Sequence, residues 1–459
     1  MSDRRAAALQ VYNQGVHANA TDRQLSYRLL GSSVDIDPTF HTGWFQVANA
    51  NADMNLLAAA AACYRRALEI DDKDARVWCN LGHRLYHLGR HDEAYEATQR
   101  ALDLDPMLAF AWCNLSLIES VMGQGDLAIE HARKAFELDP VPIIETALAF
   151  ALLFHGEYAE GLKHFEARFP YKLPQFTSYP YPQWHGEDVA GKVLLIQADQ
   201  GLGDTLCYVR FVPEVARRVG LAGKIIMTIQ PELTRLFRAM LQAYPMVEIH
   251  PLPASFPAAD YWTSTVSLPV ALGLSNNEIK FAPNLPMPPF GVMPVWKAPE
   301  RKLHIAICWG GSPLNEIDKW RSMKVEQFLE LYRVPGIQLY SLQIGERAQE
   351  LHAAGCAALI KDLAPHVRDV ADTVGILRQM DLVICVETSL GHIAGALGME
   401  CWLMVALNGG DYRIGRTGST SLWNPKHRIF RQDADARWEP VINRVVEALE
   451  IRVAEQGNV

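Results

Sequence analysis

The chain has 459 residues, of which 49% are hydrophobic, so it is long enough to bury two or three separate cores. Its formal net charge is −9 and its lysines and arginines are scattered, which gives no support to a nucleic-acid partner. The longest apolar helical stretch, residues 147–154, is too short to cross a bilayer and the first residues lack the apolar core of a signal peptide, so we expect a cytoplasmic protein without a membrane span.

The first third of the chain contains a repeat of 34 residues. Trp44, Trp78 and Trp112 recur at this spacing, and the same spacing separates the residues that end each unit, Pro38, Asp72, Pro106 and Pro140. Small residues at the eighth and twentieth positions, such as Gly82 and Ala94, let two antiparallel helices touch closely. Proline ends the second helix because it cannot continue the hydrogen-bond ladder. This pattern resembles the tetratricopeptide repeat.

The register places the boundaries of the repeats. An irregular first unit occupies residues 7–40, three clear units occupy 41–74, 75–108 and 109–142, and a shortened last unit occupies 143–169. We therefore assign residues 7–169 to a helical array. The following segment, residues 169–191, is rich in proline and aromatic residues without a helical period, and we expect an ordered strap between domains.

From Lys192 onward, buried strands alternate with helical stretches. Strands are predicted at 193–198 and 224–230, with helical stretches at 204–219 and 231–244. A proline-rich stretch, 282–299, interrupts the pattern before further strands at 304–311, 337–345, 381–387 and 401–407. This alternation predicts two parallel, doubly wound halves, at 170–290 and 300–452, with a ligand cleft between them. The predicted fold class is an α + α/β multidomain protein.

The turn after the first of these strands reads ADQGLGDTLCYVRF, residues 198–211. Gly201 and Gly203 are interpreted as supplying backbone torsions closed to other residues. Asp204 falls at the start of a helix, where it is either an N-cap or a carboxylate that acts as a general base at the cleft. The two roles are compatible, because a cap can also face a substrate.

A second turn, CWGGSPLNEIDKWRSM, follows the first strand of the second half. Gly310 and Gly311 form its glycine pair, and the cations Lys319 and Arg321 are candidates to hold a diphosphate. The alternative is that both cations are solvated loop charges.

A third turn, CVETSLGHIAGALGM, joins a strand to a helix. Glu387 ends the strand at the carboxyl edge of the sheet, where open α/β sheets contact ligands. Thr388 and Ser389 offer hydroxyls and amides at a helix N-terminus, which favours an anion. His392 follows one turn later; the alternatives are an ordinary N-cap for Thr388 and a packed histidine.

Two further features of the sequence are a basic segment near the end of the chain and a set of cysteines. The segment 409–432 contains four cations beside glycines that either line the same cleft or form a basic surface loop, namely Arg413, Arg416, Lys426 and Arg428. The eight cysteines include no C-x-x-C pair, so we expect free packing thiols rather than disulfides or zinc ligands.

Together the three turns resemble the signature stretches of the ADP-heptose:lipopolysaccharide heptosyltransferase-like glycosyltransferases, over roughly residues 170–450. This resemblance implies a GT-B fold of two Rossmann-like halves and a metal-independent, inverting sugar transfer from a nucleotide-activated donor. The resemblance implies that Asp204 is the base that deprotonates the acceptor hydroxyl and that Lys319 neutralises the phosphates of the donor. The family's D-T-x-x-x-H turn is matched at Glu387, Thr388 and His392. The sequence departs from that family at Glu387, where aspartate is usual, and at Gly391, where a small side chain is commoner.

The resemblance implies a glycosyltransferase that takes a nucleotide-sugar as its substrate and needs no cofactor or metal, and we expect the repeat array to recruit a protein acceptor. A second hypothesis is an enzyme resembling the protein O-GlcNAc transferases, with UDP-GlcNAc as donor. A third is a repeat scaffold whose α/β part is catalytically inactive.

Overall fold

The structure is a computed structural model that describes residues 3–19, 22–173, 179–199, 201–253, 258–292, 294–297, 300, 303–313, 318–407, 409–433 and 435–456. The chain divides into two compact units, Met1–Ala151 and Leu152–Val459. The division falls inside one helix, α9 (Pro142–Phe154), whereas the sequence placed the end of the array at residue 169. The last repeat helix, α10 (Tyr158–Phe165), therefore belongs to the second unit.

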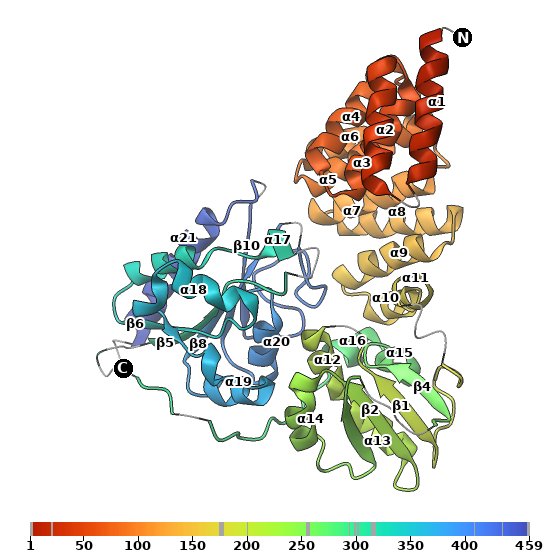
Figure 1. Ribbon diagram of the computed structural model, residues 1–459. Coiled ribbons are helices and arrows are strands. Elements are labelled where there is room, and N and C mark those ends of the chain that lie inside the picture. The colour runs from red at the N-terminus through yellow and green to blue at the C-terminus, as the bar shows by residue number, and fades with distance from the viewer. Residues whose placement is uncertain are drawn as a thin grey trace. The chain divides into compact units, whose positions relative to one another are not determined.

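The predicted repeats are pairs of antiparallel helices, drawn in red to orange in Figure 1. Their bounds follow the register of the sequence: α1 (Asp3–Ala18), α2 (Arg23–Ile36), α3 (His41–Asp53), α4 (Leu57–Ile70), α5 (Ala75–His87), α6 (His91–Leu104), α7 (Ala109–Val121) and α8 (Gly125–Leu138). The helices before Pro38, Pro106 and Pro140 all end two residues before the proline. The prediction of a helical array is confirmed.

Small residues hold the two helices of each repeat close together, as the spacing predicted. A Cβ on Gly82 would lie 2.4 Å from Oγ1 of Thr98. In the next repeat, the hydroxyl of Ser116 donates to the carbonyl of Ala128 at 2.6 Å. Such an approach of one helix to the backbone of its partner leaves no room for a larger side chain.

Hydrogen bonds of the tryptophans explain why the tryptophans and the residues that end each repeat recur at the same spacing. The Trp78 indole Nε1 donates to the carbonyl of Asp72 at 2.8 Å. Trp44 and Trp112 make the same bond to the carbonyls of Pro38 and Pro106, both at 2.9 Å. The fourth residue of each repeat thus bonds the thirty-second position of the repeat before it, while part of each indole packs in the helical core.

The described part of the aromatic strap is ordered against the first sheet of the second unit. Trp184 is buried, and its amide donates to the carbonyl of Trp262 at 2.7 Å. The rings of Phe169 and Tyr179 lie 5.2 and 5.3 Å from that of Trp262. The expected absence of helix is wrong at one end, where α11 (Arg168–Lys172) forms, and residues 174–178 lie outside the described residues.

The first sheet of this unit has four parallel strands in the order β3-β2-β1-β4. They are β1 (Val193–Gln197), β2 (Lys224–Ile229), β3 (Val247–Pro251) and β4 (Tyr261–Ser264). The helix expected at 204–219 is broken into α12 (Leu202–Tyr208), a 3-10 turn at Val209–Phe211 and α13 (Val212–Val219). Pro213 lies in the first turn of α13, where its missing N–H costs nothing. The other helices are α14 (Thr234–Met240), α15 (Leu268–Leu272) and α16 (Asn276–Lys280).

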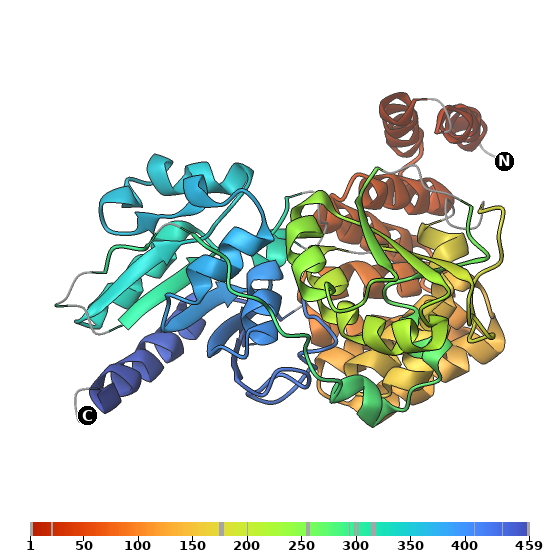
Figure 2. The same ribbon diagram turned by 90° about the horizontal axis from the view of Figure 1, so that it is seen from below.

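The second sheet has six parallel strands in the order β10-β9-β8-β5-β6-β7. The strands are β5 (Leu303–Cys308), β6 (Ile337–Ser341), β7 (Lys361–Asp362), β8 (Leu382–Val386), β9 (Cys401–Val405) and β10 (His427–Arg431). The helices include α17 (Asp318–Arg321), α18 (Glu350–Ala353), α19 (Val370–Leu377), α20 (Ser389–Ala396) and α21 (Glu439–Gln456). Figure 2 shows helices on both faces of this sheet. The prediction of two parallel α/β sheets is confirmed.

Strand order decides where each sheet presents its ligand-binding edge. The order reverses next to β1, which lies between β2 and β4, and next to β5, which lies between β6 and β8. Ligands of open α/β sheets bind outside the carboxyl ends of strands at such reversals. The turns at residues 198–204 and 309–311 follow β1 and β5, so both lie at a reversal. Among the described residues, no helix is long and apolar enough to cross a membrane.

Candidate functional site

Asp204 projects from the start of α12, just beyond the carboxyl end of β1. Its N-cap interpretation is wrong, because Gly201 is the N-cap and Asp204 is in the first turn. The Asp204 side chain is 26% exposed, and its Oδ1 accepts a hydrogen bond from Nη2 of Arg413 at 2.7 Å. A carboxylate in a first helical turn is also favoured by the helix dipole.

The glycines of this turn do not supply unusual torsions, and Gly203 is the one that is needed for space. None of the four predicted glycines, Gly201, Gly203, Gly310 and Gly311, is in the left-handed region, so the torsional interpretation of Gly201 and Gly203 is wrong. A Cβ on Gly203 would lie 2.3 Å from Cδ2 of His392. The glycine therefore makes room for the imidazole ring.

Arg413 is buried in the loop after β9 and is held by Asp411. Its Nε and Nη2 donate to the two oxygens of that carboxylate at 2.7 and 2.6 Å. Burial opposes ionisation of Asp411, but the Arg413 charge and the His392 hydrogen bond outweigh it and hold the Asp411 pKa well below its usual value. Arg413 Nη1 is buried and has no hydrogen-bond partner among the described residues. This arginine is not a solvated surface charge.

His392 is bonded at both ring nitrogens. Its Nε2 lies 3.1 Å from Oδ2 of Asp411, and its Nδ1 lies 3.4 Å from Sγ of Cys207. Burial alone would lower the His392 pKa, but the facing Cys207 thiolate and the Asp411 hydrogen bond raise it to about 10. The ring is therefore a cation at neutral pH and a poor general base.

Glu387 and Thr388 follow β8 directly, as predicted. Glu387 is buried, its Oε1 accepts from the Asp411 amide at 2.8 Å, and its Oε2 has no partner among the described residues. Burial, the largest effect, raises the Glu387 pKa. Thr388 is the N-cap residue of α20 but makes no side-chain cap bond, and its Oγ1 lies 3.8 Å from Sγ of Cys308. The half-buried Ser389 begins the helix.

Gly391 departs from the resemblance for a packing reason. A Cβ at this position would lie 2.8 Å from Cδ2 of Leu403 on the neighbouring strand β9. The glycine lets α20 lie close to the sheet.

An anionic side chain, Asp318, organises the turn after β5. Asp318 is 1% exposed, and its Oδ1 accepts from the Gly311 amide at 3.0 Å. Arg321 Nε lies 3.3 Å from the same oxygen, and Arg347 Nη2 lies 2.6 Å from Oδ2. A Cβ on Gly311 would overlap Nη2 of Arg321 at 2.3 Å, and one on Gly310 would lie 2.5 Å from Cδ of Arg347. The two glycines therefore let both arginines lie across this turn.

Lys319 is placed differently from Arg321. Its side chain is exposed, and its Nζ lies 4.3 Å from the centre of the Trp320 ring. Four predicted residues of α20 and its preceding turn, namely Glu387, Thr388, Ser389 and His392, lie together beside Asp411. Asp204 joins them through Arg413, while Lys319 is not tied to them by a contact in the described structure.

Sequence reasoning missed Gln343, Arg347, Asp411 and Cys207. Gln343 is 2% exposed and fixes the turn after β5, accepting from the Gly310 amide at 2.9 Å and donating to the Gly310 carbonyl at 3.0 Å. Polar residues just beyond the predicted strands at 337–345 and 401–407 were an available signal for Arg347 and Asp411. No local signal pointed to Cys207.

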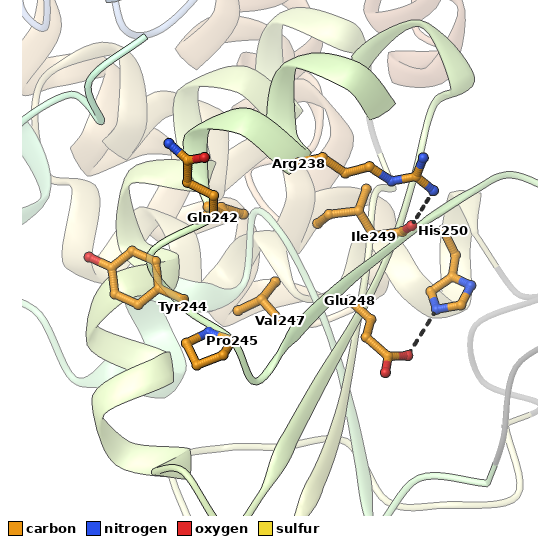
Figure 3. Close-up of a pocket in the computed structure, with 9 residues that line it drawn as sticks. Arg238, Gln242, Tyr244, Pro245, Val247, Glu248, Ile249 and His250 are labelled. Atoms are coloured by element: carbon orange, nitrogen blue, oxygen red, sulfur yellow. Dashed lines mark hydrogen bonds and ion pairs between the residues drawn. The ribbon is translucent and has the colours of Figure 1, made fainter. Parts of the chain in front are cut away.

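A cavity of about 370 Å³ lies at the carboxyl ends of β6 and β7, and its described lining includes neither Arg347 nor a predicted site residue. Its lining includes Gly345, Ala348, Asp362 and Pro365. A second cavity, of about 400 Å³, lies between α14 and the edge strand β3 and contains none of the predicted site residues. There the Arg238 guanidinium donates to the Ile249 carbonyl at 3.1 Å (Figure 3).

The helical array consists of tetratricopeptide repeats. Residues 41–74 and residues 75–107 each match this repeat family. Protein FlbA of Caulobacter vibrioides is 24% identical over 332 residues, which is 67% of this chain and 55% of FlbA. The chain therefore spans just over half the length of that relative.

Several solved structures are similar to the array at low identity. The crystal structure of MamA is 22% identical, with 36% of this chain and 97% of that chain covered and a TM-score of 0.31. The pilF protein of Pseudomonas aeruginosa is 24% identical, with 38% and 78% covered and a TM-score of 0.33. YrrB, described as a TPR protein with an unusual peptide-binding site, is 15% identical, with 37% and 91% covered and a TM-score of 0.30.

Proposed function

We propose that the second unit is a glycosyltransferase that moves a sugar from a nucleotide-activated donor to an acceptor, as the heptosyltransferase-like GT-B enzymes do. The observation that carries this proposal is the ion pair between Asp204 and Arg413. Through it, a carboxylate that follows β1 of the first sheet meets the polar turns that follow β8 and β9 of the second. A sugar transfer needs a base on one side of the reacting carbon and cationic or amide groups on the leaving diphosphate on the other.

The donor diphosphate is assigned to the carboxyl edge of β5 and β8. The backbone amides at the N-terminus of α20, beside Thr388 and Ser389, can bind an anion. Arg321 and Arg347 converge on the turn after β5, and Lys319 lies two residues before Arg321 in the sequence. The cavity of about 370 Å³ at the carboxyl ends of β6 and β7 offers space for the nucleoside.

We assign the role of general base to Asp204. Its carboxylate retains 26% exposure, so an acceptor hydroxyl can reach it. The acceptor oxygen attacks the anomeric carbon while Asp204 takes its proton, and the bond from that carbon to the diphosphate oxygen breaks. This single displacement inverts the anomeric centre, and the cations named above stabilise the charge that develops on the diphosphate. His392, bonded on both sides, acts as a fixed positive charge.

The tetratricopeptide repeats of the first unit recruit the acceptor, which we take to be a protein. Stacked repeats bury a continuous core and leave an extended groove that suits an elongated polypeptide better than a sugar. Deleting residues 1–140 keeps α9 and the second unit. The truncated protein should bind donor and hydrolyse it slowly, yet fail to modify its native acceptor; equal glycosylation by both proteins would remove the array from acceptor recruitment.

A screen of thermal stability with ADP-, UDP-, GDP- and CMP-sugars tests the proposal. A ligand that binds only the folded form must raise the unfolding midpoint. One nucleotide class should raise it in the full chain, and the same screen distinguishes an ADP-heptose type of donor from UDP-GlcNAc. A chain that responds to no donor contradicts the proposal.

One observation favours a second candidate, a repeat scaffold with an inactive α/β unit. Asp204 is already paired with Arg413, and both nitrogens of His392 are bonded within the chain. A site whose polar groups satisfy one another is also what a structural unit would have. Absence of any response in the donor screen supports this candidate.

A further inference from the structure

Cys207 differs from the other cysteines in the charges that face it. All eight cysteines are free. Burial raises the pKa of Cys63, Cys79, Cys113, Cys308 and Cys356, and a hydrogen bond with Cys401, together with burial, raises that of Cys385. At Cys207, burial is outweighed by the positive charges of His392 and Arg413, which lower the pKa of the thiol. A thiolate is the reactive form of cysteine.

The geometry around Cys207 is that of an activated nucleophile. Its Sγ lies 3.4 Å from Nδ1 of His392, and Nε2 of the same ring lies 3.1 Å from Oδ2 of Asp411. The carboxylate fixes the ring and stabilises its positive charge, while the ring faces the sulfur. Three separate elements supply the three groups: α12, α20 and the loop after β9.

The His392 ring packs against the helix that carries Cys207. Gly203 and Cys207 are four residues apart on α12 and therefore share one face of the helix. The His392 ring lies against this face, 2.3 Å from the position of a Gly203 Cβ. Arg210 adds a further positive charge, with its Nε donating to the Cys207 carbonyl at 2.8 Å.

We propose that Cys207 is a modification site for peroxide, with His392 as the proton donor to the leaving group. The thiolate sulfur attacks one oxygen of hydrogen peroxide, a sulfur–oxygen bond forms and the oxygen–oxygen bond breaks. The departing hydroxide takes the proton from Nδ1 of His392 and leaves as water. Sulfur is oxidised to a sulfenic acid, peroxide is reduced, and His392 becomes neutral. Cys207 is 4% exposed, which favours so small an oxidant over bulky disulfides.

Oxidation removes the attraction between α12 and α20 and adds an oxygen to a tightly packed contact. Because α12 carries Asp204 and α20 begins beside Thr388, this change reaches both sides of the proposed transfer site. That consequence rests on the proposed function, whereas the modification of Cys207 does not. A labelling experiment therefore tests the site without any assay of sugar transfer.

The full chain is treated with hydrogen peroxide and dimedone at pH 6.5, and each cysteine is quantified by peptide mass spectrometry. Cys207 should be labelled about tenfold or more faster than the other cysteines, including Cys63, the least buried of the eight. His392→Asn should lower the Cys207 rate about tenfold, because it removes the facing charge and the proton donor. Labelling of Cys207 only in urea, or no faster than that of Cys63, overturns the proposal.

If His392→Asn does not fold, the labelling rate of Cys207 can instead be measured at several pH values in the wild-type chain. Of the other titratable groups near the pair, Asp411, Arg413 and Arg210 stay charged between pH 6 and 8, and His427 stays neutral because burial lowers its pKa to about 3. Because the facing charges lower the pKa of the Cys207 thiol while burial raises that of Cys63, the labelling rate of Cys207 should level off at a lower pH than that of Cys63, and identical pH profiles overturn the proposal. Peroxide should also lower the unfolding midpoint of the wild type but not of Cys207→Ser, and equal losses in both proteins count against it.

Discussion

Nη2 of Arg413 lies 2.7 Å from Oδ1 of Asp204, although 209 residues separate them in the sequence. The same guanidinium nitrogen lies 2.6 Å from Asp411, whose carboxylate in turn bonds His392. Asp204 is therefore oriented by a buried cation rather than free in solvent. This single relationship joins the turn after β1 to the loop after β9.

Asp204→Asn should abolish sugar transfer and leave donor binding intact. The amide keeps the size of the side chain and can still accept a hydrogen bond from Arg413, but it cannot take a proton from the acceptor. Loss of a general base typically lowers the rate by about two to four orders of magnitude. Turnover and nucleotide affinity are measured side by side, with Glu232→Gln, an exposed acid, as control. A near wild-type rate would show that Asp204 is not the base.

Lys319→Ala should weaken binding of the nucleoside diphosphate by about 1.5 kcal/mol, near the lower end for a charge-assisted contact, since this lysine is exposed. This corresponds to roughly a tenfold rise in Kd, which calorimetry resolves. Lys324→Ala provides a matched control, an exposed lysine on the same stretch. Equal affinities for Lys319→Ala and Lys324→Ala would exclude Lys319 from the phosphate site.

The contribution of His392 to stability should disappear at high pH. The folded protein holds the His392 pKa at about 10, above its ordinary value of 6.5, so the stabilisation is complete below pH 6.5 and is lost as pH rises through 10. Wild type and His392→Gln are unfolded in urea at pH 6, 8 and 10.5. The difference in their free energies of unfolding should be largest at pH 6 and smallest at pH 10.5; a difference independent of pH would mean that the ring is neutral in the folded chain.

Two glycines in the array should respond oppositely to the same substitution. Gly82→Ala places a methyl group 2.4 Å from Oγ1 of Thr98 and should lower the free energy of unfolding by about 1–3 kcal/mol. Gly31→Ala, in α2, meets no atom within 4 Å and should raise it by about 0.5–1 kcal/mol through helix propensity. Thermal or chemical unfolding of both variants decides the matter, and stabilisation by Gly82→Ala would refute the close packing of α5 on α6.

Trp78→Phe should lower the free energy of unfolding by about 0.5–1.5 kcal/mol, because the ring is kept but the hydrogen bond to Asp72 is lost. Trp296→Phe serves as control, since that tryptophan is 68% exposed. If both variants unfold like the wild type, the bond contributes nothing to the joint between repeats.

The array and the sheets could be predicted because their signals are local. The 34-residue register and the buried strand runs each lie within a short window of sequence, and every strand predicted from them is present. The break at Pro213 was also readable, since proline rarely lies inside a helix, yet the amphipathic pattern of 204–219 concealed it.

The partners of the site residues could not be predicted, because they depend on non-local packing. Cys207 and His392 are 185 residues apart, and no spacing rule connects them. Gly203 shows the same limit: a glycine beside a turn suggests a torsional role, whereas the reason for it is the ring of His392. What the sequence supplied was the strand end at which each residue lies, and this was correct for Asp204, Gly310 and Glu387.

The bonds from Trp44, Trp78 and Trp112 to carbonyls in the preceding unit also restrict how such an array changes length during evolution. Each joint takes its donor from the fourth residue of one repeat and its acceptor from the thirty-second of the repeat before. A duplication or loss of one whole repeat recreates both ends of the joint. Donor and acceptor are six residues apart, so an insertion between them would separate the indole from its carbonyl, whereas an insertion elsewhere in a repeat would leave the joint intact.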